Sequence, residues 1–301
     1  MSPTPLPSAD GVVVVPAPRR GPGHWAGAPS ALLDDDGTVW LAHRLRRPAD
    51  DGRGVEVVVA RSGDGVAFQP VAHVRRDAFG AASLERPAIT RRPDGGWRLY
   101  VSCATPGSKH WWVEALDADS PDGLPEGRRT VVHAGSADVG VKDPVVLVDD
   151  EGWWMWLCCH PLDEPGQEDR MTTRLLHSDD GLTWTDRGEV LRGTPGTWDA
   201  RGARVTAVLS RDPLVVLYDG RACMHENWFE RTGVARTYDG SVTLRADDGG
   251  PAASSPHGDG ALRYATAVAR RGGGLRWYAE VAHADGSHDL ITSVSPSPGE
   301  T

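Results

Sequence analysis

The sequence predicts an all-β fold, a five-bladed β-propeller with four antiparallel strands per blade. Three observations predict it: a turn motif that recurs in phase, strand-like segments at the same period, and no helical periodicity along the chain. Repeats of about 40–60 residues built from short strands are typical of propeller blades. Five such units account for nearly all of the 301 residues. A β-sandwich is the alternative fold, but it gives no reason for a constant period.

The recurring motif is Ser/Thr-x-Asp-Gly, which is typical of tight turns between strands. An aromatic residue follows the first and third copies at the same offset, Phe68 and Trp184, as expected for a hairpin held by a ring. The period is about 58 residues, because the four copies begin at Ser62, Ser120, Ser178 and Thr237.

A second set of turn sequences lies upstream in the same phase. Each is followed by a run rich in β-branched, aromatic and apolar residues, which indicates a strand. These runs are 38–43, 97–103, 153–159, 214–218 and 275–281. We therefore expect one domain over residues 1–301, with blades at roughly 25–75, 83–135, 140–192, 198–245 and 260–295, and with segment 11–16 as a strand that closes the ring.

The composition narrows the class of protein. Apolar residues make up 39% and charged residues 25%, and no apolar run approaches the ~18 residues of a membrane span. The net charge of −10 argues against a nucleic-acid partner, which requires a concentrated basic face. No basic segment precedes the short apolar run near the start of the chain, so no secretion signal is expected. These features predict a soluble, cytoplasmic protein with a small-molecule or sugar ligand and no membrane partner.

The cysteines do not predict a metal site. Cys158 and Cys159 are adjacent and would point to opposite faces of a strand, so the four cysteines are expected to be free and buried. We expect no cofactor, with a calcium ion on the propeller axis as the alternative, because no cluster has dedicated ligand spacing. The lysines are only Lys109 and Lys142, and an ammonium has a tunable pKa that arginine lacks.

Polar residues stand where the first strand of each blade begins. First strands line the central channel of a propeller, so these residues converge on one pocket. They include three carboxylates, three arginines and a lysine in segments that would otherwise be apolar. The segments are 24–29, 83–87, 141–144, 198–202 and 262–264.

The Ser-x-Asp-Gly hairpins, the Asp-Asp-x-Gly turns and the Lys142-Asp143-Pro144 sequence together resemble the five-bladed glycoside hydrolases, the arabinanase and xylosidase group (family 43) and the invertase group (family 32). The resemblance covers the architecture of the whole chain and suggests a divergent member. It implies three acids, in the first, third and fourth blades. Asp143 matches the third-blade acid, which orients substrate and tunes pKa, and Asp199 falls near the fourth-blade acid, where Glu is usual.

The first blade departs from that pattern. Gly27-Ala28-Pro29-Ser30 holds no carboxylate where the resemblance implies a base or nucleophile, and Glu85 in the second blade is the nearest acid that could replace it. We therefore expect Asp143, Asp199 and Glu85 to be catalytic. Ion pairing along the axis, Glu85 with Arg86 and Asp199 with Arg201, is the structural alternative.

Further polar and aromatic residues are expected to bind the substrate, because guanidinium and imidazole groups bind sugar hydroxyls, carboxylates or phosphates and aromatic rings stack on sugar rings. They are Trp25, Arg86, Lys142, His160, Arg170, Arg201, Asp219, Arg221, Glu226, His257, Arg263 and Tyr264. The expected function is that of a glycoside hydrolase-like enzyme acting on a small glycoside. Two alternatives stay open: a non-hydrolytic propeller enzyme of secondary metabolism that performs elimination, cyclisation or another tailoring step, and a noncatalytic sugar-binding propeller.

Overall fold

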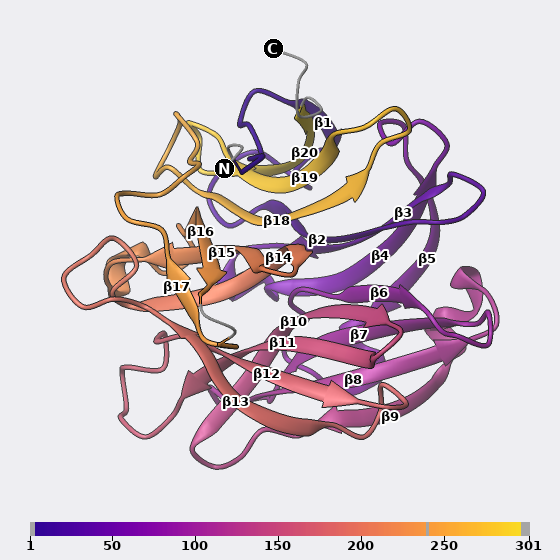
Figure 1. Ribbon diagram of the computed structural model, residues 1–301, viewed down its shortest axis with the longest axis horizontal. Coiled ribbons are helices and arrows are strands. Elements are labelled where there is room, and N and C mark those ends of the chain that lie inside the picture. Colours follow the sequence, from indigo (N-terminus) through magenta and orange to yellow (C-terminus); the bar gives the residue numbers. More distant parts are fainter. Residues whose placement is uncertain (1–3, 239–240, 296–301) are drawn as a thin grey trace.

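The strands of the computed structural model, which describes residues 4–238 and 241–295, form five antiparallel blades around a central axis (Figure 1). This confirms the predicted fold class. The first blade comprises β2 (Trp25–Leu33), β3 (Val39–Arg46), β4 (Gly54–Ser62) and β5 (Gln69–Arg75). The second comprises β6 (Ala88–Arg91), β7 (Trp97–Ala104), β8 (Trp111–Ala118) and β9 (Arg128–His133). The third comprises β10 (Val139–Asp149), β11 (Gly152–Pro161), β12 (Thr172–Ser178) and β13 (Thr185–Arg192).

The fourth blade comprises β14 (Gly202–Arg211), β15 (Leu214–Arg221), β16 (Arg231–Thr237) and β17 (Leu244–Ala246). The fifth comprises β18 (Leu262–Ala269), β19 (Leu275–Ala282), β20 (His288–Ser295) and β1 (Val12–Val15). The described helices are short 3-10 turns, η1 (Ala49–Asp51), η2 (Arg76–Phe79), η3 (Pro121–Glu126) and η4 (Met224–Glu226). None of the helices within the described residues is long and apolar enough to cross a membrane.

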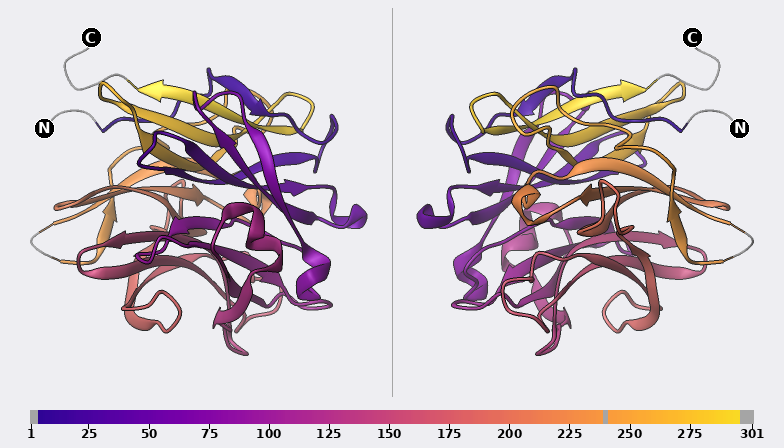
Figure 2. Two further views of the ribbon diagram at one scale, coloured as in Figure 1. Left: turned by 90° about the vertical axis from the view of Figure 1, so that its right-hand side faces the viewer. Right: turned by 90° about the vertical axis from the view of Figure 1, so that its left-hand side faces the viewer.

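The fifth blade is assembled from both ends of the described chain. β1 pairs antiparallel with β20, with Val12 opposite Thr292, so an N-terminal strand adds the outer strand to a blade formed by C-terminal strands (Figure 2). One parallel pair, Trp25 with His288, joins this blade to the first. The ring is therefore held together by backbone pairing between distant parts of the sequence.

The second strand of each blade is buried on both faces because neighbouring blades pack against it. Every residue of β7 is buried, and Trp97, Trp153 and Trp277 fill the spaces between successive blades. Each large ring removes apolar area from water worth roughly 3 kcal/mol or more. These interfaces explain why the predicted second-strand runs are rich in tryptophan.

The turn motif joins blades as well as strands. In the first copy, Ser62 Oγ accepts the N–H of Gly65, and Asp64 Oδ1 accepts the N–H groups of Val66 and Ala67 at 2.8 and 2.9 Å. The Gly65 carbonyl accepts a hydrogen bond from Tyr278 of the fifth blade at 2.9 Å. The third copy repeats this arrangement, with Tyr100 of the second blade donating to Gly181 at 2.7 Å.

The second copy has a different structure. Ser120 lies at the start of η3, where Pro121 occupies the first turn and its fixed φ favours a helical start over a hairpin. In the fourth copy, Asp239 and Gly240 lie outside the described residues.

Candidate active site

Three first strands break in the same way where they reach the axis. Pairing shifts register between Gly27 and Ser30 in β2, between Lys142 and Val145 in β10, and between Arg263 and Thr266 in β18. The first unpaired residue of each break has a left-handed backbone, with φ of 52° at Ala28, 56° at Asp143 and 55° at Tyr264. A non-glycine residue pays about 1 kcal/mol for this conformation, and such bulges redirect side chains near functional sites. The blades therefore deliver Ala28, Asp143 and Tyr264 to equivalent axial positions.

Ser102 on β7 ties the second and third blades together at this level. Its hydroxyl donates to the carbonyl of Arg86 at 2.9 Å and accepts the N–H of Asp143 at 2.8 Å. The backbone N–H of Arg86 in turn donates to Asp143 Oδ1 at 3.1 Å. These bonds hold the left-handed Asp143 in place.

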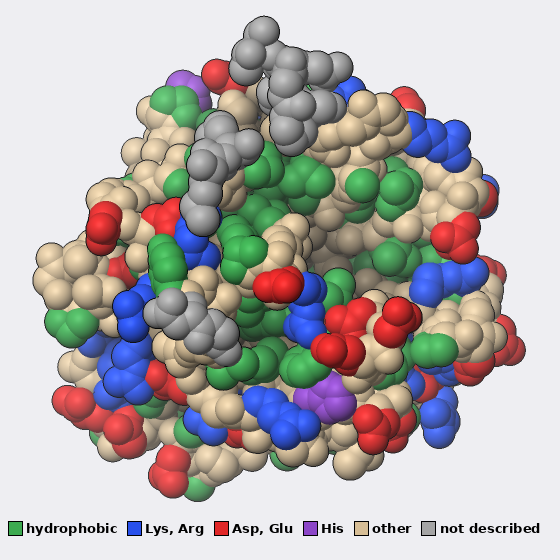
Figure 3. Space-filling view, in the orientation of Figure 1, with side chains coloured by type: hydrophobic (Ala, Val, Ile, Leu, Met, Phe, Trp, Pro, Cys, Tyr) green, Lys and Arg blue, Asp and Glu red, His purple; other side chains and the backbone are tan. Residues whose placement is uncertain are grey.

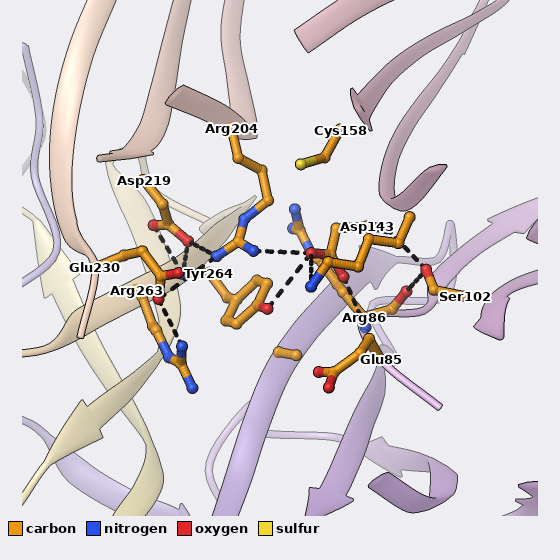
Figure 4. Close-up of polar contacts among 12 residues, drawn as sticks. Glu85, Arg86, Ser102, Asp143, Cys158, Arg204, Asp219, Glu230, Arg263 and Tyr264 are labelled. Carbon is orange, nitrogen blue, oxygen red and sulfur yellow. Dashed lines mark hydrogen bonds and ion pairs between the residues drawn. The ribbon is translucent and has the colours of Figure 1, made fainter. Parts of the chain in front are cut away.

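A network of alternating acids and arginines fills the axis (Figure 4). Arg204 bridges two carboxylates, with Nη1 2.8 Å from Asp143 Oδ2 and Nη2 2.6 Å from Asp219 Oδ2. Its guanidinium carbon lies 3.9 Å from the centre of the Tyr264 ring. Asp219 also accepts the N–H of Tyr264 at 3.1 Å. The third, fourth and fifth blades are thus linked through one buried arginine.

The network continues around the axis through Arg263. Its Nη1 lies 2.6 Å from Glu230 Oε2, and its Nη2 lies 2.7 Å from Glu280 Oε1. Glu280 also pairs with Arg44, at 2.9 Å, and Arg44 pairs in turn with Glu85. All of these side chains are buried, so each charge depends on its partners rather than on water.

Glu280 of the fifth blade reaches the segment of the first blade that holds no carboxylate. The N–H of Ala28 donates to Glu280 Oε2 at 3.1 Å, and a Cβ added at Gly27 would collide with the Glu280 carboxylate. This acid is fully enclosed by Arg44, Arg263 and the His288 ring, whose Nδ1 lies 2.9 Å away. It stabilises the ring of blades and does not line the cavity above it.

Most axial carboxylates are held ionised. Burial opposes ionisation of Asp143, but the neighbouring Lys142 and Arg204 outweigh it and lower its pKa to about 2. Burial likewise opposes ionisation of Glu85, and Arg44 and Lys142 lower its pKa below the ordinary value. Asp219 differs, because burial, with a smaller contribution from the nearby Glu230, raises its pKa to about 6.

His160 stands beside this network as a neutral base. Burial, with Lys142 nearby, lowers its pKa to about 3. Its Nδ1 lies 3.0 Å from the carbonyl oxygen of Glu168, and its Nε2 lies 3.6 Å from Cys158 Sγ. The first contact requires the proton on Nδ1, so Nε2 is the acceptor.

A narrow cavity lies against this network, with a free volume of about 20 Å³, room for about one water molecule. Among the described residues that line it, six are basic and two, Glu85 and Glu230, are acidic. The basic residues are Arg44, Arg46, Lys142, Arg204, Arg221 and Arg263, and the remaining lining residues are Trp25, His160, Asn227, Trp228 and Tyr264. We call this the basic pocket.

Two of its cations are less fully paired than the other four. The Arg46 side chain makes no hydrogen bond or ion pair with any residue in the described part of the chain, and its guanidinium lies 4.0 Å from the ring centre of Trp25 and 4.7 Å from that of Trp228. Burial lowers the pKa of Arg46 to about 9. Lys142 Nζ lies 3.4 Å from Asp143 Oδ2 and 5.0 Å from the ring centre of Trp111. Both cations remain able to pair with a ligand.

The loop from β15 to β16 covers the basic pocket. It contains η4 and then Trp228, which has a left-handed backbone with φ of 84° and packs edge-on against Trp25 at 6.1 Å. This conformation is costly for a bulky residue and is held by the stacked Arg46. The loop is therefore the element whose movement would enlarge the pocket.

The structure gathers many of the residues predicted for the site and separates others. Around the basic pocket lie Trp25, Glu85, Lys142, His160, Arg221, Arg263 and Tyr264, with Asp143 and Asp219 directly behind them. Arg86 borders a second cavity on the opposite side of the network. Outside both lie Asp199, Arg170, Arg201, Glu226 and His257.

These outlying residues have local partners. Asp199 precedes β14 and accepts hydrogen bonds from Tyr218 at 2.9 Å, from the N–H of Thr194 at 3.1 Å and from Thr197. Arg201 pairs with Asp169 at 2.5 Å. Arg170 pairs with Asp163, Glu226 pairs with Arg231 at 2.7 Å, and His257 is exposed. A catalytic role for Asp199 stays a prediction that this geometry does not favour.

Sequence reasoning missed Arg44, Arg46, Arg204 and Glu280. All stand on strands whose other residues are largely apolar and buried. A usable signal was present in β3, where Arg44 and Arg46 alternate with Leu45 at the end of the strand that faces the pocket. Within the described residues, no group of three or more His, Cys, Asp and Glu side chains is placed to hold a metal ion.

Comparison with known proteins finds similarity in structure and not in sequence. No protein-family model matches the chain, and no curated protein matches it in sequence. A glycosyl hydrolase from Bacteroides ovatus superposes with a TM-score of 0.64 at 12% identity, covering 98% of this chain and 96% of that one.

Two further solved structures give similar agreement. An α-L-arabinofuranosidase from Lactobacillus brevis gives a TM-score of 0.67 at 13% identity, covering 91% of each chain. A β-1,2-mannobiose phosphorylase from Listeria innocua, solved with β-1,2-mannobiose, gives 0.63 at 16%, covering 91% and 90%. The chain therefore has the five-bladed propeller fold of these carbohydrate-active enzymes.

Proposed function

We propose that the protein is a carbohydrate-active enzyme that acts on a small glycoside carrying an acidic group, bound in the basic pocket. The buried Arg46 carries this proposal, because it pairs with no described acid, whereas the other five basic lining residues already have acidic partners. A buried, unpaired positive charge is costly unless a counterion is supplied, and an acidic substrate supplies one. The enzymes that share the fold act on glycosides, which supports the sugar part of the proposal.

Arg46 and Lys142 are the residues that would bind the acidic group. The Arg46 guanidinium contacts the rings of Trp25 and Trp228, and its N–H groups have no hydrogen-bond partner among the described residues, so they are left for an oxyanion. Lys142 adds a compact charge on the third blade. Opening of the loop that carries Trp228 would admit the sugar. Closure of the loop would return the Trp228 ring to the Arg46 guanidinium.

Glu85 is the carboxylate best suited to act on the substrate. It lines the basic pocket, and its pKa is lowered, although burial opposes ionisation, because Arg44 and Lys142 lie nearby. An ionised carboxylate serves as a base or nucleophile and not as a proton donor. Asp143 lies behind it and positions Lys142 and Arg204.

Hydrolysis in this pocket would depend strongly on the leaving group. The pKa is lowered in both carboxyl groups that line it, Glu85 and Glu230, so neither carries a proton to donate near neutral pH. Glycosides with acidic phenol leaving groups should therefore react much faster than alkyl glycosides. A phenol oxygen is a weak base when it departs, so its departure does not require protonation by the enzyme.

The same observation favours a second candidate, elimination from a uronoside. Pairing the carboxylate with Arg46 and Lys142 would acidify the adjacent C–H, and Glu85 would remove that proton. The electron pair would form a carbon–carbon double bond as the bond to the oxygen substituent on the next carbon breaks, and the departing oxygen would take up a proton, from Glu85 or from water, to leave as an alcohol. No carboxyl proton donor is needed before the first step, which matches the ionised state of Glu85.

The test compares neutral and acidic 4-nitrophenyl glycosides, together with oligouronides, on the purified protein. We expect turnover of acidic substrates only, with nitrophenol release indicating hydrolysis and ultraviolet absorbance of an unsaturated acid indicating elimination. Arg46→Met should reduce kcat/KM for the acidic substrate by at least about tenfold, the value of one charged hydrogen bond. Equal activity on neutral and acidic sugars, or no activity on any sugar, would contradict the proposal.

The stability of Arg46→Met shows whether Arg46 binds the substrate or supports the fold. Arg46 pairs with no described acid, so Arg46→Met keeps the packing between Trp25 and Trp228 and should change the free energy of unfolding by less than about 1 kcal/mol. Arg44→Met is the matched control. It removes the guanidinium shared by the buried Glu85 and Glu280 and should cost about 3–5 kcal/mol.

A further inference from the structure

The central channel has a second cavity, on the far side of the ion-pair network from the basic pocket. Its free volume is about 320 Å³, within the range of small-molecule sites. All five first strands contribute to its wall, which is largely apolar. The lining residues used below are Ile89, Val145, Leu147, Thr206, Val208 and Thr266. Figure 3 shows the hollow at the centre of this face, with hydrophobic side chains gathered around it.

Arg86 separates the two cavities. It borders the apolar one, and its guanidinium spans the channel: Nε donates to the Pro29 carbonyl at 3.1 Å and Nη2 to the Thr206 carbonyl at 2.7 Å. The basic pocket does not include Arg86 in its lining. The network therefore divides the channel into a polar compartment and an apolar one.

The guanidinium of Arg86 has no direct ion-pair partner in the described ranges. Asp219 and Asp143 act on its charge from the network side, but Arg86 is only 2% exposed, burial dominates and lowers its pKa to about 10, and its Nη1 has no hydrogen-bond partner. Thr206 Oγ1, beside it in the cavity lining, also has no partner. Unpaired buried groups of this kind are rare and costly. Both atoms are enclosed beside the apolar cavity in the free protein, and they are donors that a carboxylate reaching this end of the cavity would satisfy.

The charges around the cavity agree with this reading. Arg86 and Arg91 are the charged residues among those that line it, and no acid lines it. Arg91 is half-exposed, and its Nε lies 3.6 Å from Asp34 Oδ1, so its charge has a partner. Arg86 is left as the cation to be neutralised, at the end of a wall formed by Val145, Leu147 and Val208.

We propose that this apolar cavity is a binding site for a small carboxylic acid with a hydrocarbon body. The carboxylate pairs with Arg86 and accepts a hydrogen bond from Thr206, and the hydrocarbon part packs against Ile89, Val145 and Val208. The site is independent of the proposed enzymatic function, because it shares no lining residue with the basic pocket. Arg86 touches the ion-pair network through its backbone N–H, which donates to Asp143.

Isothermal titration calorimetry of the full chain with sodium hexanoate tests the proposal, with hexan-1-ol as the uncharged probe. We expect saturable binding of hexanoate and weaker binding of the alcohol. Thr206→Val removes a hydroxyl that has no partner in the free protein, so the fold is retained and hexanoate affinity should fall about fivefold or more. Arg86→Met should reduce hexanoate affinity by at least about tenfold and leave hexan-1-ol unaffected.

Two variants locate the bound acid. Thr266→Phe fills the cavity from the half-buried wall of β18 and should abolish binding of both probes. Lys142→Met alters only the basic pocket and should leave hexanoate affinity unchanged. The proposal is overturned if hexanoate does not saturate, if the alcohol binds equally well, if Thr266→Phe binds as the wild type does, or if Lys142→Met removes binding.

Discussion

Tyr264 Oη lies 3.5 Å from Asp143 Oδ2, although the two residues are far apart in the sequence. They occupy equivalent bulged positions in β18 and β10, with φ of 55° and 56°. Propeller geometry brings these equivalent positions to one axis, so the same left-handed bulge in two blades places a phenol against a carboxylate. The equivalent bulge in β2 presents only the methyl group of Ala28.

Asp143→Asn should unfold more easily and lose activity. Asparagine adopts the left-handed conformation readily, so the backbone is retained. The lost charge leaves Lys142 without its carboxylate and Arg204 with fewer partners, and we expect a cost of about 3 kcal/mol in the free energy of unfolding. Urea denaturation measures it.

Tyr264→Phe is the control for that variant. It removes only the long contact to Asp143 and should cost less than about 1 kcal/mol. Equal losses in the two variants would mean that packing, and not charge, dominates at the axis.

Ala28→Gly should leave stability unchanged or raise it by up to about 1 kcal/mol. Glycine adopts the left-handed conformation without strain, and this relief offsets its larger entropy in the unfolded chain. Ala26→Gly, at a buried position earlier in the same strand, has no such strain to relieve and should destabilise by about 1 kcal/mol. Thermal unfolding of the two variants checks the difference. A larger loss at Ala28 than at Ala26 would contradict the strain argument.

Ser178→Ala should destabilise the protein by about 1 kcal/mol. The Ser178 hydroxyl accepts the N–H groups of Asp180 and Gly181 and orders the turn that contacts Tyr100. Ser120 starts the second copy of the motif, where the turn is replaced by η3 and the hydroxyl has no such role. Ser120→Ala should therefore change stability by only a few tenths of a kcal/mol. The denaturant midpoints of Ser178→Ala and Ser120→Ala measure this difference in stability.

The repeat made the fold predictable, because a turn motif in constant phase requires equivalent blades. The axial position of Glu85, Lys142, Asp143 and Tyr264 followed from the rule that first strands line the channel. The position of Asp199 could not be obtained in this way, because β14 begins only at Gly202 and its first register shift lies beyond Asp199, between Val205 and Ala207. Arg204 occupies the axial place instead, and a short acidic sequence near the right spacing could not reveal that difference.

The second strands were harder to interpret. Arg44 and Glu280 belong to strands that otherwise form the packed interior, where sequence patterns predict burial. Whether a buried charge is paired depends on side chains from other blades, and pairing such as that of Arg44 with Glu280 has no local signal. The two-compartment channel depends on those contacts and thus appears only in three dimensions.

The stability difference between the wild type and Asp219→Asn should depend on pH. Burial raises the pKa of Asp219 from 3.8 to about 6 in the folded protein. Between these values the folded state binds more protons than the unfolded state, so the contribution of Asp219 to stability falls as pH rises. We expect the free energy of unfolding of the wild type, relative to the variant, to fall by at most about 3 kcal/mol between about pH 4 and 6.

Asp143→Asn supplies the opposite control, because the pKa of Asp143 is lowered to about 2, with Lys142 and Arg204 outweighing burial. The stabilisation from Asp143 is fully present above its unfolded pKa of 3.8 and is lost only as pH falls toward 2. The difference in free energy of unfolding between the wild type and Asp143→Asn should therefore stay constant from about pH 4 to 6. The same difference for Asp219→Asn should change over that range. Urea titrations at four pH values across this window measure both, and a flat profile for Asp219→Asn would show that Arg204 keeps Asp219 ionised throughout.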